Sequence, residues 1–218
     1  MLDRKLYAHI TTYPSILTRS WVVIVWTSFL YIGYQLTNRY QVFQPTELPL
    51  FEFEQQIPFL MWTVIPYFLL IGGMYLPIFI RSSDNFLKSL YAFAVAVCIN
   101  YSIFLFYPTV YPRPELPEMV GVSGWAYHWL VGIDTPANCF PSGHVCVPAI
   151  GIWYVSREFP QHRYLLWFSF LLLVLTVLTT KQHYAVDILA GLVTASIGIA
   201  SAEWIYKRRI GKEIDSQQ

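Results

Sequence analysis

Charged side chains are scarce in this chain, at 12% of its 218 residues. A soluble domain carries about a quarter, so this deficit excludes water as the main solvent of the folded chain. The net charge of +1 offers no field that would attract nucleic acid or an acidic partner. With 56% hydrophobic residues and a mean hydropathy of +0.45, the composition predicts an integral membrane protein.

Cysteine is also scarce, with three residues at Cys98, Cys139 and Cys146. An odd number without metal-ligand spacing argues against a disulfide framework and against a cysteine metal site. We expect buried thiols, and a disulfide between Cys139 and Cys146 is the less favoured alternative. No short apolar core with a small-residue cleavage site follows Arg4 and Lys5, so a cleaved signal peptide is not expected.

Long apolar stretches are what the chain has in abundance. The hydrocarbon core of a bilayer is about 30 Å thick, and a helix rises about 1.5 Å per residue. Stretches suited to crossing it lie at 21–37, 57–80, 89–107, 143–156, 164–181 and 184–206. We therefore predict an all-α fold, a bundle of six transmembrane helices that forms a single membrane domain over residues 1–218.

The basic residues predict how this bundle is oriented. Eleven of the 14 Lys and Arg residues precede the first stretch, follow the last one, or lie in the connections 81–88 and 156–163. The positive-inside rule then places the segments 1–20 and 207–218 in the cytoplasm, for a protein of a plasma or inner membrane. The connections expected on the outer, periplasmic or lumenal, face are 38–56, 108–142 and 181–184.

Two of these outer connections have distinctive compositions. In 38–56, apolar and acidic residues alternate, which is typical of an amphipathic segment at the headgroups or of a plain connecting loop. The 108–142 connection is rich in Pro, Gly and aromatic residues, so we expect a structured active-site loop rather than a linker. Its aromatic run, which is expected in the membrane interface, comprises Trp125, Tyr127, His128 and Trp129.

Three clusters of chemically capable residues fall at this outer face. The first is Tyr111-Pro112-Arg113-Pro114, in which prolines restrict the backbone around an arginine. A guanidinium held in this way suits an anionic oxygen. The alternative is an interfacial arginine that extends to lipid headgroups.

The second cluster, Pro141-Ser142-Gly143-His144, opens the fourth stretch. Free backbone N–H groups at Ser142 and Gly143 would form an anion site at the positive end of a helix, with His144 within one turn of it. An N-cap serine beside an interfacial histidine is the alternative.

The third cluster contains Lys181, His183 and Asp187. A spacing of four predicts that His183 and Asp187 share one helical face, so that the carboxylate orients one ring nitrogen and leaves the other nucleophilic. A purely structural pair is the alternative. An arginine, a helix start with a histidine, and a histidine with its own carboxylate together are the parts that phosphoryl transfer requires.

These motifs resemble the type 2 phosphatidic acid phosphatase (PAP2) superfamily, whose membrane members are six-helix lipid phosphatases and phosphotransferases with a core like that of vanadium haloperoxidases. The resemblance covers about residues 60 to 206 and is carried by the residues Arg113-Pro114, Pro141-Ser142-Gly143-His144, His183, Asp187 and Gly191. Three positions depart from the family pattern, because Phe106 replaces a lysine, and Thr176 and Val177 replace a serine and an arginine. Lys181 is the expected substitute for one missing cation. The pair His183-Tyr184 with Asp187 also resembles the head-group transferase branch, which includes sphingomyelin and inositol phosphorylceramide synthases.

The resemblance implies that His183, oriented by Asp187, attacks phosphorus to form a phosphohistidine while His144 protonates the leaving oxygen. The two imidazoles are expected to face each other across a phosphate-sized gap. The groups expected to bind the phosphate oxygens are Arg113, Ser142, Gly143 and Lys181. Neither a metal nor a cofactor is expected, and a haem between the two histidines is disfavoured by their predicted place at the membrane surface.

The expected function is therefore a membrane phosphatase acting on lipid phosphate monoesters or pyrophosphates, such as phosphatidate, phosphatidylglycerol phosphate or an isoprenyl pyrophosphate. Membrane lipids are the expected partners, and nucleic acid is not. A lipid phosphotransferase or head-group transferase is the first alternative. A non-catalytic transporter or scaffold is the second.

Overall fold

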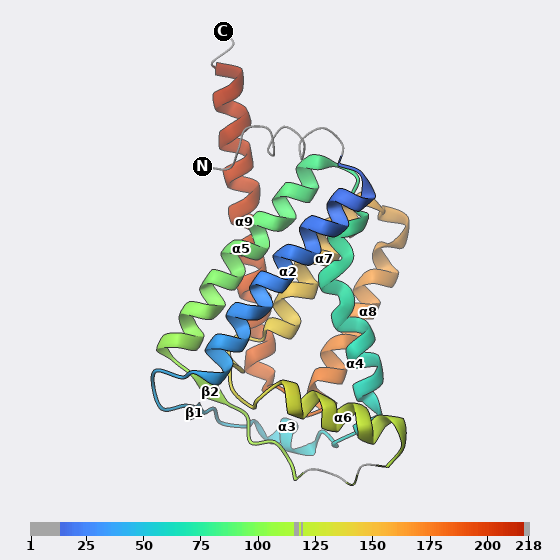
Figure 1. Cartoon of the computed structure of the whole chain (residues 1–218), viewed down its shortest axis with the longest axis vertical. Coiled ribbons are helices and arrows are strands. Elements are labelled where there is room, and N and C mark those ends of the chain that lie inside the picture. The colour runs from blue at the N-terminus through green and yellow to red at the C-terminus, as the bar shows by residue number, and fades with distance from the viewer. Residues whose placement is uncertain (1–13, 116–117, 119, 216–218) are drawn as a thin grey trace.

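The computed structural model describes the backbone of residues 14–115, 118 and 120–215. Its helices are α2 (Ile16–Arg39), α3 (Glu52–Gln56), α4 (Val64–Ile71), α5 (Ser83–Phe106), α6 (Gly121–Ile133), α7 (Gly143–Glu158), α8 (Arg163–Thr179) and α9 (Ala185–Asp215). Short 3-10 helices are η1 (Met61–Thr63), η2 (Gly72–Phe79) and η3 (Pro160–His162). Two short strands, β1 (Thr46–Glu47) and β2 (Thr109–Val110), complete the elements (Figure 1).

The expected all-α membrane fold is confirmed. Among the described residues, five helical segments are long and apolar enough to cross a membrane, and they are Ile16–Arg39, Met61–Phe79, Ser83–Phe106, Pro160–Thr179 and Ala185–Arg208. The fourth expected stretch forms α7, which has 16 residues and runs beside the others (Figure 1). It is shorter than a typical spanning helix, so the count of six transmembrane helices stays a prediction.

Local sequence explains where the long helices begin and why one of them is irregular. Ser15 and Ser82 precede α2 and α5, and their hydroxyls accept hydrogen bonds from the amides of Thr18 and Asn85. The stretch expected as one helix over 57–80 is instead α4 between two 3-10 segments. Pro77 lies inside η2 and has no amide donor, which disfavours a regular α-helix there.

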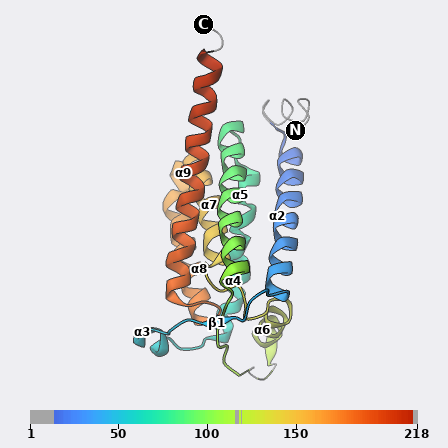
Figure 2. The same cartoon turned by 90° about the vertical axis from the view of Figure 1, so that its left-hand side faces the viewer.

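Small residues allow the helices to approach closely (Figure 2). A Cβ added at Gly198 of α9 would lie 2.5 Å from the carbonyl oxygen of Ala92 on α5. A Cβ at Gly151 of α7 would lie 2.6 Å from the carbonyl oxygen of Gly73 on η2. Such contacts replace the hydrophobic driving force that helix association lacks inside a bilayer.

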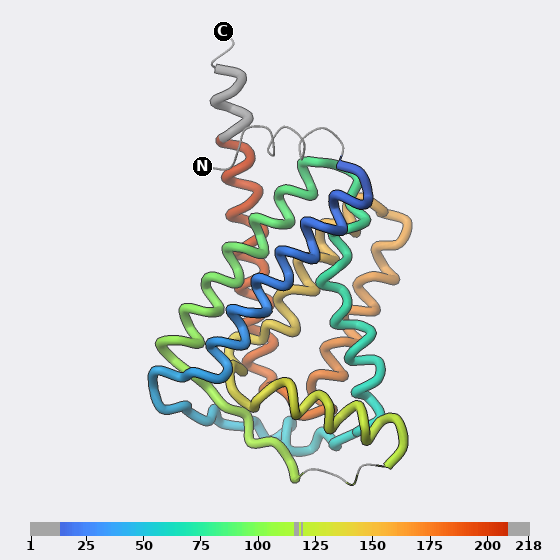
Figure 3. The backbone as a smooth tube through the Cα atoms, viewed as in Figure 1, coloured from blue at the N-terminus to red at the C-terminus, as the bar shows by residue number. Residues whose placement is uncertain are grey.

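The two ends of the bundle differ (Figures 1 and 2). At one end, β1 and β2 pair in parallel and α6 lies across the helices. At the other end, the carboxylate of Glu203 on α9 accepts hydrogen bonds from Lys88 at 2.8 Å and Arg157 at 2.7 Å. The connections expected on one membrane face thus gather at one end, as the tube in Figure 3 also shows. Which face this end occupies stays a prediction.

The structure adds detail to two connections that are expected on the outer face. The sequence left 38–56 open between an amphipathic segment and a plain loop; it contains the end of α2, the short strand β1 and the short helix α3, and the residues between them have no regular structure. The connection 108–142 contains α6, from which Trp125 and Trp129 project with 61% and 48% of their surfaces exposed. Their place in the membrane interface stays a prediction.

The cysteine prediction holds for two of the three residues. Cys139 and Cys146 are buried free thiols, so the alternative of a disulfide between them is wrong. Cys98 is free but exposed, because it lies on the outer side of α5, and the expectation of a buried thiol there is wrong.

Replacing Gly198 with alanine is expected to destabilise the bundle. The added methyl group would overlap a backbone carbonyl, which cannot rotate away as a side chain can, and overpacking of this kind costs about 1–3 kcal/mol. Thermal unfolding in detergent measures the effect. Gly132→Ala is the matched control, because a Cβ at Gly132 meets nothing within 4 Å. Equal melting temperatures for the two variants would contradict the close approach of α5 and α9.

Candidate active site

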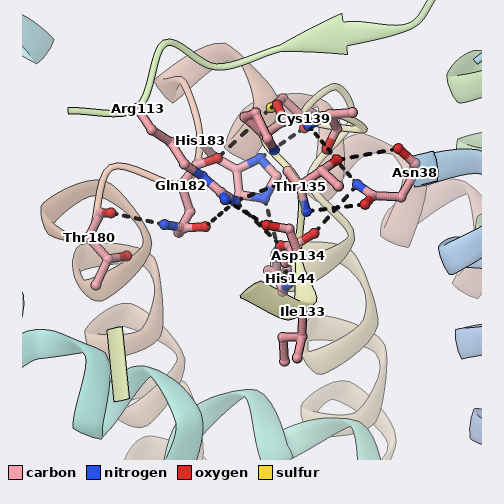
Figure 4. A network of polar contacts seen from close by, with 12 residues as sticks. Asn38, Arg113, Ile133, Asp134, Thr135, Cys139, His144, Thr180, Gln182 and His183 are labelled. Atoms are coloured by element: carbon pink, nitrogen blue, oxygen red, sulfur yellow. Dashed lines mark hydrogen bonds and ion pairs between the residues drawn. The ribbon is translucent and has the colours of Figure 1, made fainter. Parts of the chain in front are cut away.

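The three clusters found in the sequence meet at the end of the bundle covered by α6 (Figure 4). His144 lies in the first turn of α7, and His183 lies in the turn just before α9. Nδ1 of His144 and Nε2 of His183 are 2.9 Å apart. Arg113, from the segment after β2, reaches the same place and contacts Gln182. The structure therefore brings together residues from three separate parts of the chain.

His183 is held in a defined orientation. Its Nδ1 is 2.9 Å from the carbonyl oxygen of Cys139 and 3.2 Å from Oδ2 of Asp187. Both neighbours act as acceptors. The Cys139 carbonyl has no proton to donate, and the Asp187 carboxylate also accepts the backbone N–H of Tyr184. Nδ1 therefore carries the proton in the neutral ring, and Nε2 keeps a lone pair directed at His144.

The sequence correctly predicted contact between His183 and Asp187, but it predicted the wrong geometry for that contact. His183 precedes α9, which begins at Ala185, so the two residues do not share a helical face. Asp187 instead lies in the first turn of α9 and reaches back to the turn before it, where it accepts the Tyr184 amide at 3.0 Å. The carboxylate thus stabilises the helix start and orients the ring at once.

The expected phosphate-sized gap between the histidines is not present. The rings touch through a hydrogen bond, with Nδ1 of His144 as donor and Nε2 of His183 as acceptor. In-line transfer needs phosphorus about 3 Å from one nitrogen and a leaving oxygen within hydrogen-bond reach of the other. A phosphate group must therefore part the rings before it can occupy the site.

Arg113 is fixed by the loop residues around it. Its Nη1 donates to the carbonyl oxygen of Asp134 at 2.6 Å, and its Nη2 donates to Oε1 of Gln182 at 2.7 Å and to the carbonyl oxygen of Thr135 at 3.2 Å. Only 10% of the side chain is exposed, so it does not extend toward lipid headgroups. Its Nε is buried without a hydrogen-bond partner. One donor of the guanidinium is therefore left for a ligand.

The start of α7 differs in one detail from the expected anion site. The amide of Ser142 donates to the carbonyl oxygen of Asp187 at 3.0 Å, so it is not free. This contact is possible because Gly191 has no Cβ, which would lie 2.6 Å from the Ser142 carbonyl oxygen. Ser142 Oγ is buried without a partner, and a Cβ at Gly143 would meet only open space. The hydroxyl and the uncapped amides of the first turn are the groups available to an anion.

Lys181 points to a different neighbour from the one expected. Its Nζ donates to the carbonyl oxygen of Glu54 at 3.1 Å. The backbone of Lys181 has a φ of 53°, in the left-handed region. Partial burial lowers the pKa of Lys181, and the nearby Glu54 carboxylate opposes this shift. In this arrangement the ammonium group stabilises the loop before α9, and its proposed role in phosphate binding requires it to leave that carbonyl.

Glu54 links the 38–56 connection to the helix that carries Asp187. Its side chain is buried, with Oε1 accepting the amide of Ala185 at 2.5 Å and Oε2 accepting the amide of Phe51 at 2.8 Å. A carboxylate at the first amides of α9 stabilises a helix N-terminus. Glu54 therefore fixes the backbone on which the His183 and Asp187 pair depends.

The three positions that depart from the family pattern differ in their surroundings. Phe106 is 75% exposed, on the outer surface of the bundle. Val177 is fully buried in the core, and the hydroxyl of Thr176 donates to the Leu173 carbonyl within α8. Restoring a cation at Phe106 alone would therefore not place it beside Arg113.

A cavity of about 610 Å³ opens beside His144. It runs between α2, α4, η2, α5, α6 and α7, and its walls are largely aliphatic and aromatic. Its polar end is formed by Asp134, Gly143, His144 and the hydroxyl-bearing rings of Tyr34 and Tyr67. The shape and lining suit an apolar chain whose polar group lies at His144.

One group among the described residues has metal-ligand geometry. The ligand atoms of Cys139, His183 and Asp187 lie within 4.8 Å of one another. Burial, with the Asp187 and Asp134 carboxylates adding to it, raises the pKa of the Cys139 thiol well above its usual range. Metal binding needs the thiolate, whereas this thiol donates to the Pro136 carbonyl at 3.0 Å. The arrangement is better suited to holding the His183 ring than to holding an ion.

The sequence did not single out Asp134 or Gln182. Both are buried polar residues in contact with Arg113, but each lies far along the chain from its partners and neither belongs to a periodic pattern. An acid directly after the apolar run Leu130-Val131-Gly132-Ile133 was the available signal for Asp134. Tyr34 and Asn38 of α2 complete this network from nearly 100 residues away.

The described residues form an all-α membrane-protein fold, and two histidines from separate helix starts are in contact at one end of it. Residues 61–201, more than half of the chain, match the family model of the PAP2 superfamily. The chain belongs to the PAP2 superfamily, as its motifs predicted. This membership supports a phosphatase-type function in general terms. Neither the curated proteins nor the solved structures contain a match to the chain.

Removing the Glu54 carboxylate is expected to loosen the start of α9. Glu54→Ala leaves the amides of Ala185 and Phe51 without their acceptors, and loss of such a cap costs about 0.5–2 kcal/mol. Hydrogen exchange at the Ala185 amide, with thermal unfolding alongside, measures the effect. Glu52→Ala on the same short helix is the control, since Glu52 is exposed. Unchanged protection of Ala185 in Glu54→Ala would show that Glu54 does not fix this turn.

Proposed function

We propose that the protein is a lipid phosphate phosphatase that works through a covalent phosphohistidine at His183. The single observation that carries the proposal is the hydrogen bond between His144 and His183, with Asp187 on the far side of His183. This arrangement supplies an oriented nucleophile and a proton donor within one buried site. Membership of the PAP2 superfamily supports the same class of reaction.

In the first half-reaction, the substrate phosphate lies between the two rings. The Nε2 lone pair of His183 attacks phosphorus, and the bond between phosphorus and the lipid oxygen breaks in line with it. The Nδ1 proton of His144 passes to the departing oxygen, which leaves as an alcohol. Asp187 stabilises the positive charge that His183 acquires.

In the second half-reaction, a water molecule replaces the departed alcohol. Nδ1 of His144 accepts a proton from the water as its oxygen attacks phosphorus, and the bond between phosphorus and Nε2 of His183 breaks. Inorganic phosphate leaves, and both rings return to their starting protonation states. One histidine thus serves as acid and then as base.

The phosphate oxygens need donors, and the structure has three kinds available. The Nε of Arg113 and the Oγ of Ser142 are buried without partners. The uncapped amides from Gly143 onward lie at the positive end of α7. Lys181 joins this set if its ammonium group breaks its hydrogen bond to the Glu54 carbonyl. Together they would stabilise charge on the equatorial oxygens during transfer.

The cavity beside His144 supports a lipid as the substrate. A largely apolar space of about 610 Å³ can hold part of an acyl or isoprenyl chain while its phosphate reaches the histidines. The candidate substrates are phosphatidate, phosphatidylglycerol phosphate and an isoprenyl pyrophosphate. A soluble sugar phosphate has no apolar chain that could fill this cavity. The positive-inside pattern supports a site on the outer face of the membrane, with the termini in the cytoplasm.

The cavity also favours a second candidate, a lipid phosphotransferase. An alcohol that enters along apolar walls could reach His144 in place of water and accept the group held on His183. Comparing phosphate release with the mass of the lipid products, in vesicles with and without added lipid alcohols, separates the two functions. A non-catalytic transporter or scaffold would form no phosphohistidine with any lipid phosphate.

His183→Ala is expected to abolish turnover, because the nucleophile is lost. Phosphate release from a panel of phosphorylated lipids in vesicles measures this, and labelling with ³²P-phosphatidate detects the covalent intermediate. His162→Ala is the control, since His162 is exposed in η3. Retained labelling in His183→Ala, or no labelling in the unmodified protein with any lipid phosphate, would sink the proposed mechanism.

His144→Ala is expected to lower the rate by about 10²–10⁴, the usual contribution of a general acid and base. With an aryl phosphate, whose leaving group needs no proton, the first half-reaction should be much less affected. The phosphohistidine should therefore accumulate, because His144 is also missing as the base for water. Rapid quenching and acid-labile labelling measure this. Near-normal turnover of a lipid phosphate would overturn the role given to His144.

A further inference from the structure

The two histidines belong to a chain of four groups with a carboxylate at each end; Figure 4 labels both histidines and one of the carboxylates, Asp134. On one side, Asp187 lies 3.2 Å from Nδ1 of His183. On the other side, Oδ2 of Asp134 lies 4.0 Å from Nε2 of His144. The inner nitrogens of the two rings face each other at 2.9 Å. Each ring therefore presents its outer nitrogen to its own carboxylate.

Asp134 is held firmly in its position by other groups. It is 7% exposed, and Tyr34 donates its hydroxyl to Oδ1 at 2.6 Å. Asn38 lies 3.5 Å from the same oxygen, and Arg113 donates to the Asp134 backbone carbonyl. These contacts use Oδ1 and the backbone, whereas Oδ2 faces His144 and, at 3.7 Å, Arg113.

We propose that Asp134 is a positioning residue for His144, whose Nε2–H it accepts as a hydrogen bond when a phosphate group parts the two rings. This inference rests on the proposed function of the histidine pair. The entering phosphate monoester supplies the second proton of His144, so that the ring carries a proton on both nitrogens. The Nε2 proton then stays on the ring, and only the Nδ1 proton moves to the leaving oxygen and back from water. Asp134 would thus orient the acid, His144, as Asp187 orients the nucleophile, His183.

The geometry makes ring separation and this hydrogen bond parts of one movement. The two nitrogens of an imidazole lie on roughly opposite sides of the ring, so a shift of His144 away from His183 moves Nε2 toward Asp134. A hydrogen bond needs about 2.7–3.2 Å, and the present distance is 4.0 Å. The shift of about 1 Å that completes this hydrogen bond is therefore in the direction of the larger separation that a phosphate group requires.

The charges around His144 explain why it needs a carboxylate. The groups that face the ring are Tyr34 from α2, Tyr67 from α4, His183 and Arg113. The Arg113 guanidinium and a positively charged His183 both oppose a proton on His144. Burial raises the pKa of Asp134 above its usual value, and the Tyr34 hydroxyl, Arg113 and His183 limit this rise. A carboxylate stabilised by these donors is the group that can offset the positive charge of a protonated His144.

Asp134→Asn tests the role without removing the network. The asparagine keeps the carbonyl that binds Arg113 and an oxygen that can accept from Tyr34, but it loses the negative charge. We expect kcat for a lipid phosphate to fall by about 10- to 100-fold, part of a full general-acid contribution, with KM changed less than about twofold. Asp84→Asn, at an exposed position in the first turn of α5, is the matched control.

The pH profile gives a readout that a merely structural role would not move. The alkaline limb of kcat/KM reports the loss of the proton from the acid. Removing a carboxylate makes protonated His144 less favourable, so this limb should shift to lower pH in Asp134→Asn. Labelling of His183 by an aryl phosphate should stay near normal, because its leaving group needs no proton.

The outcomes are separable. If the unmodified protein forms no phosphohistidine, the proposed function fails and this inference fails with it. If it does and Asp134→Asn turns over the lipid phosphate normally or keeps the alkaline limb in place, only the role of Asp134 is refuted. Loss of aryl phosphate labelling in a variant that melts normally would show that Asp134 supports Arg113 or the fold instead, and would also overturn the proposal.

Discussion

The contact between His144 and His183 depends on how closely the first turns of α7 and α9 approach each other. That approach is a backbone interaction, in which the Ser142 amide donates to the Asp187 carbonyl at 3.0 Å. It is possible because Gly191 leaves room for the Ser142 carbonyl. A larger residue at that position would separate the turns and carry the two rings apart, whatever their side chains were. The geometry of the site is thus set by packing between two helix ends.

The connections at this end of the bundle supply the acceptors that the buried polar groups need. The carbonyls of Cys139, Asp134 and Glu54 accept from His183, Arg113 and Lys181 in that order. Inside a membrane protein, irregular backbone is tolerated where it lines a protein interior in this way. The connecting segments that carry these carbonyls are therefore walls of the site.

The sequence predicted those parts of the structure that are governed by local patterns. Hydropathy located the helical stretches, most closely at the expected 143–156 and the observed Gly143–Glu158, but it did not predict the 3-10 segments within 57–80. The spacing of His183 and Asp187 predicted their contact. Asp134, Gln182 and Glu54 were missed, because each acts through a partner in another segment and burial decides its role. The closed ring contact was also missed, since motif spacing carries no information about the distance between two helices.

The closed pair shows how a buried site can exist without its substrate. An imidazole nitrogen left unpaired in a low-dielectric interior is costly, and here each inner nitrogen satisfies the other at 2.9 Å. On the proposed mechanism, an entering phosphate breaks this one hydrogen bond and offers its oxygens to both rings. The displaced His144 can then form the contact to Asp134 that is still open at 4.0 Å. The hydrogen bond that is lost between the rings is thus replaced by hydrogen bonds to the phosphate and to Asp134. This replacement offsets the free-energy cost of opening the site.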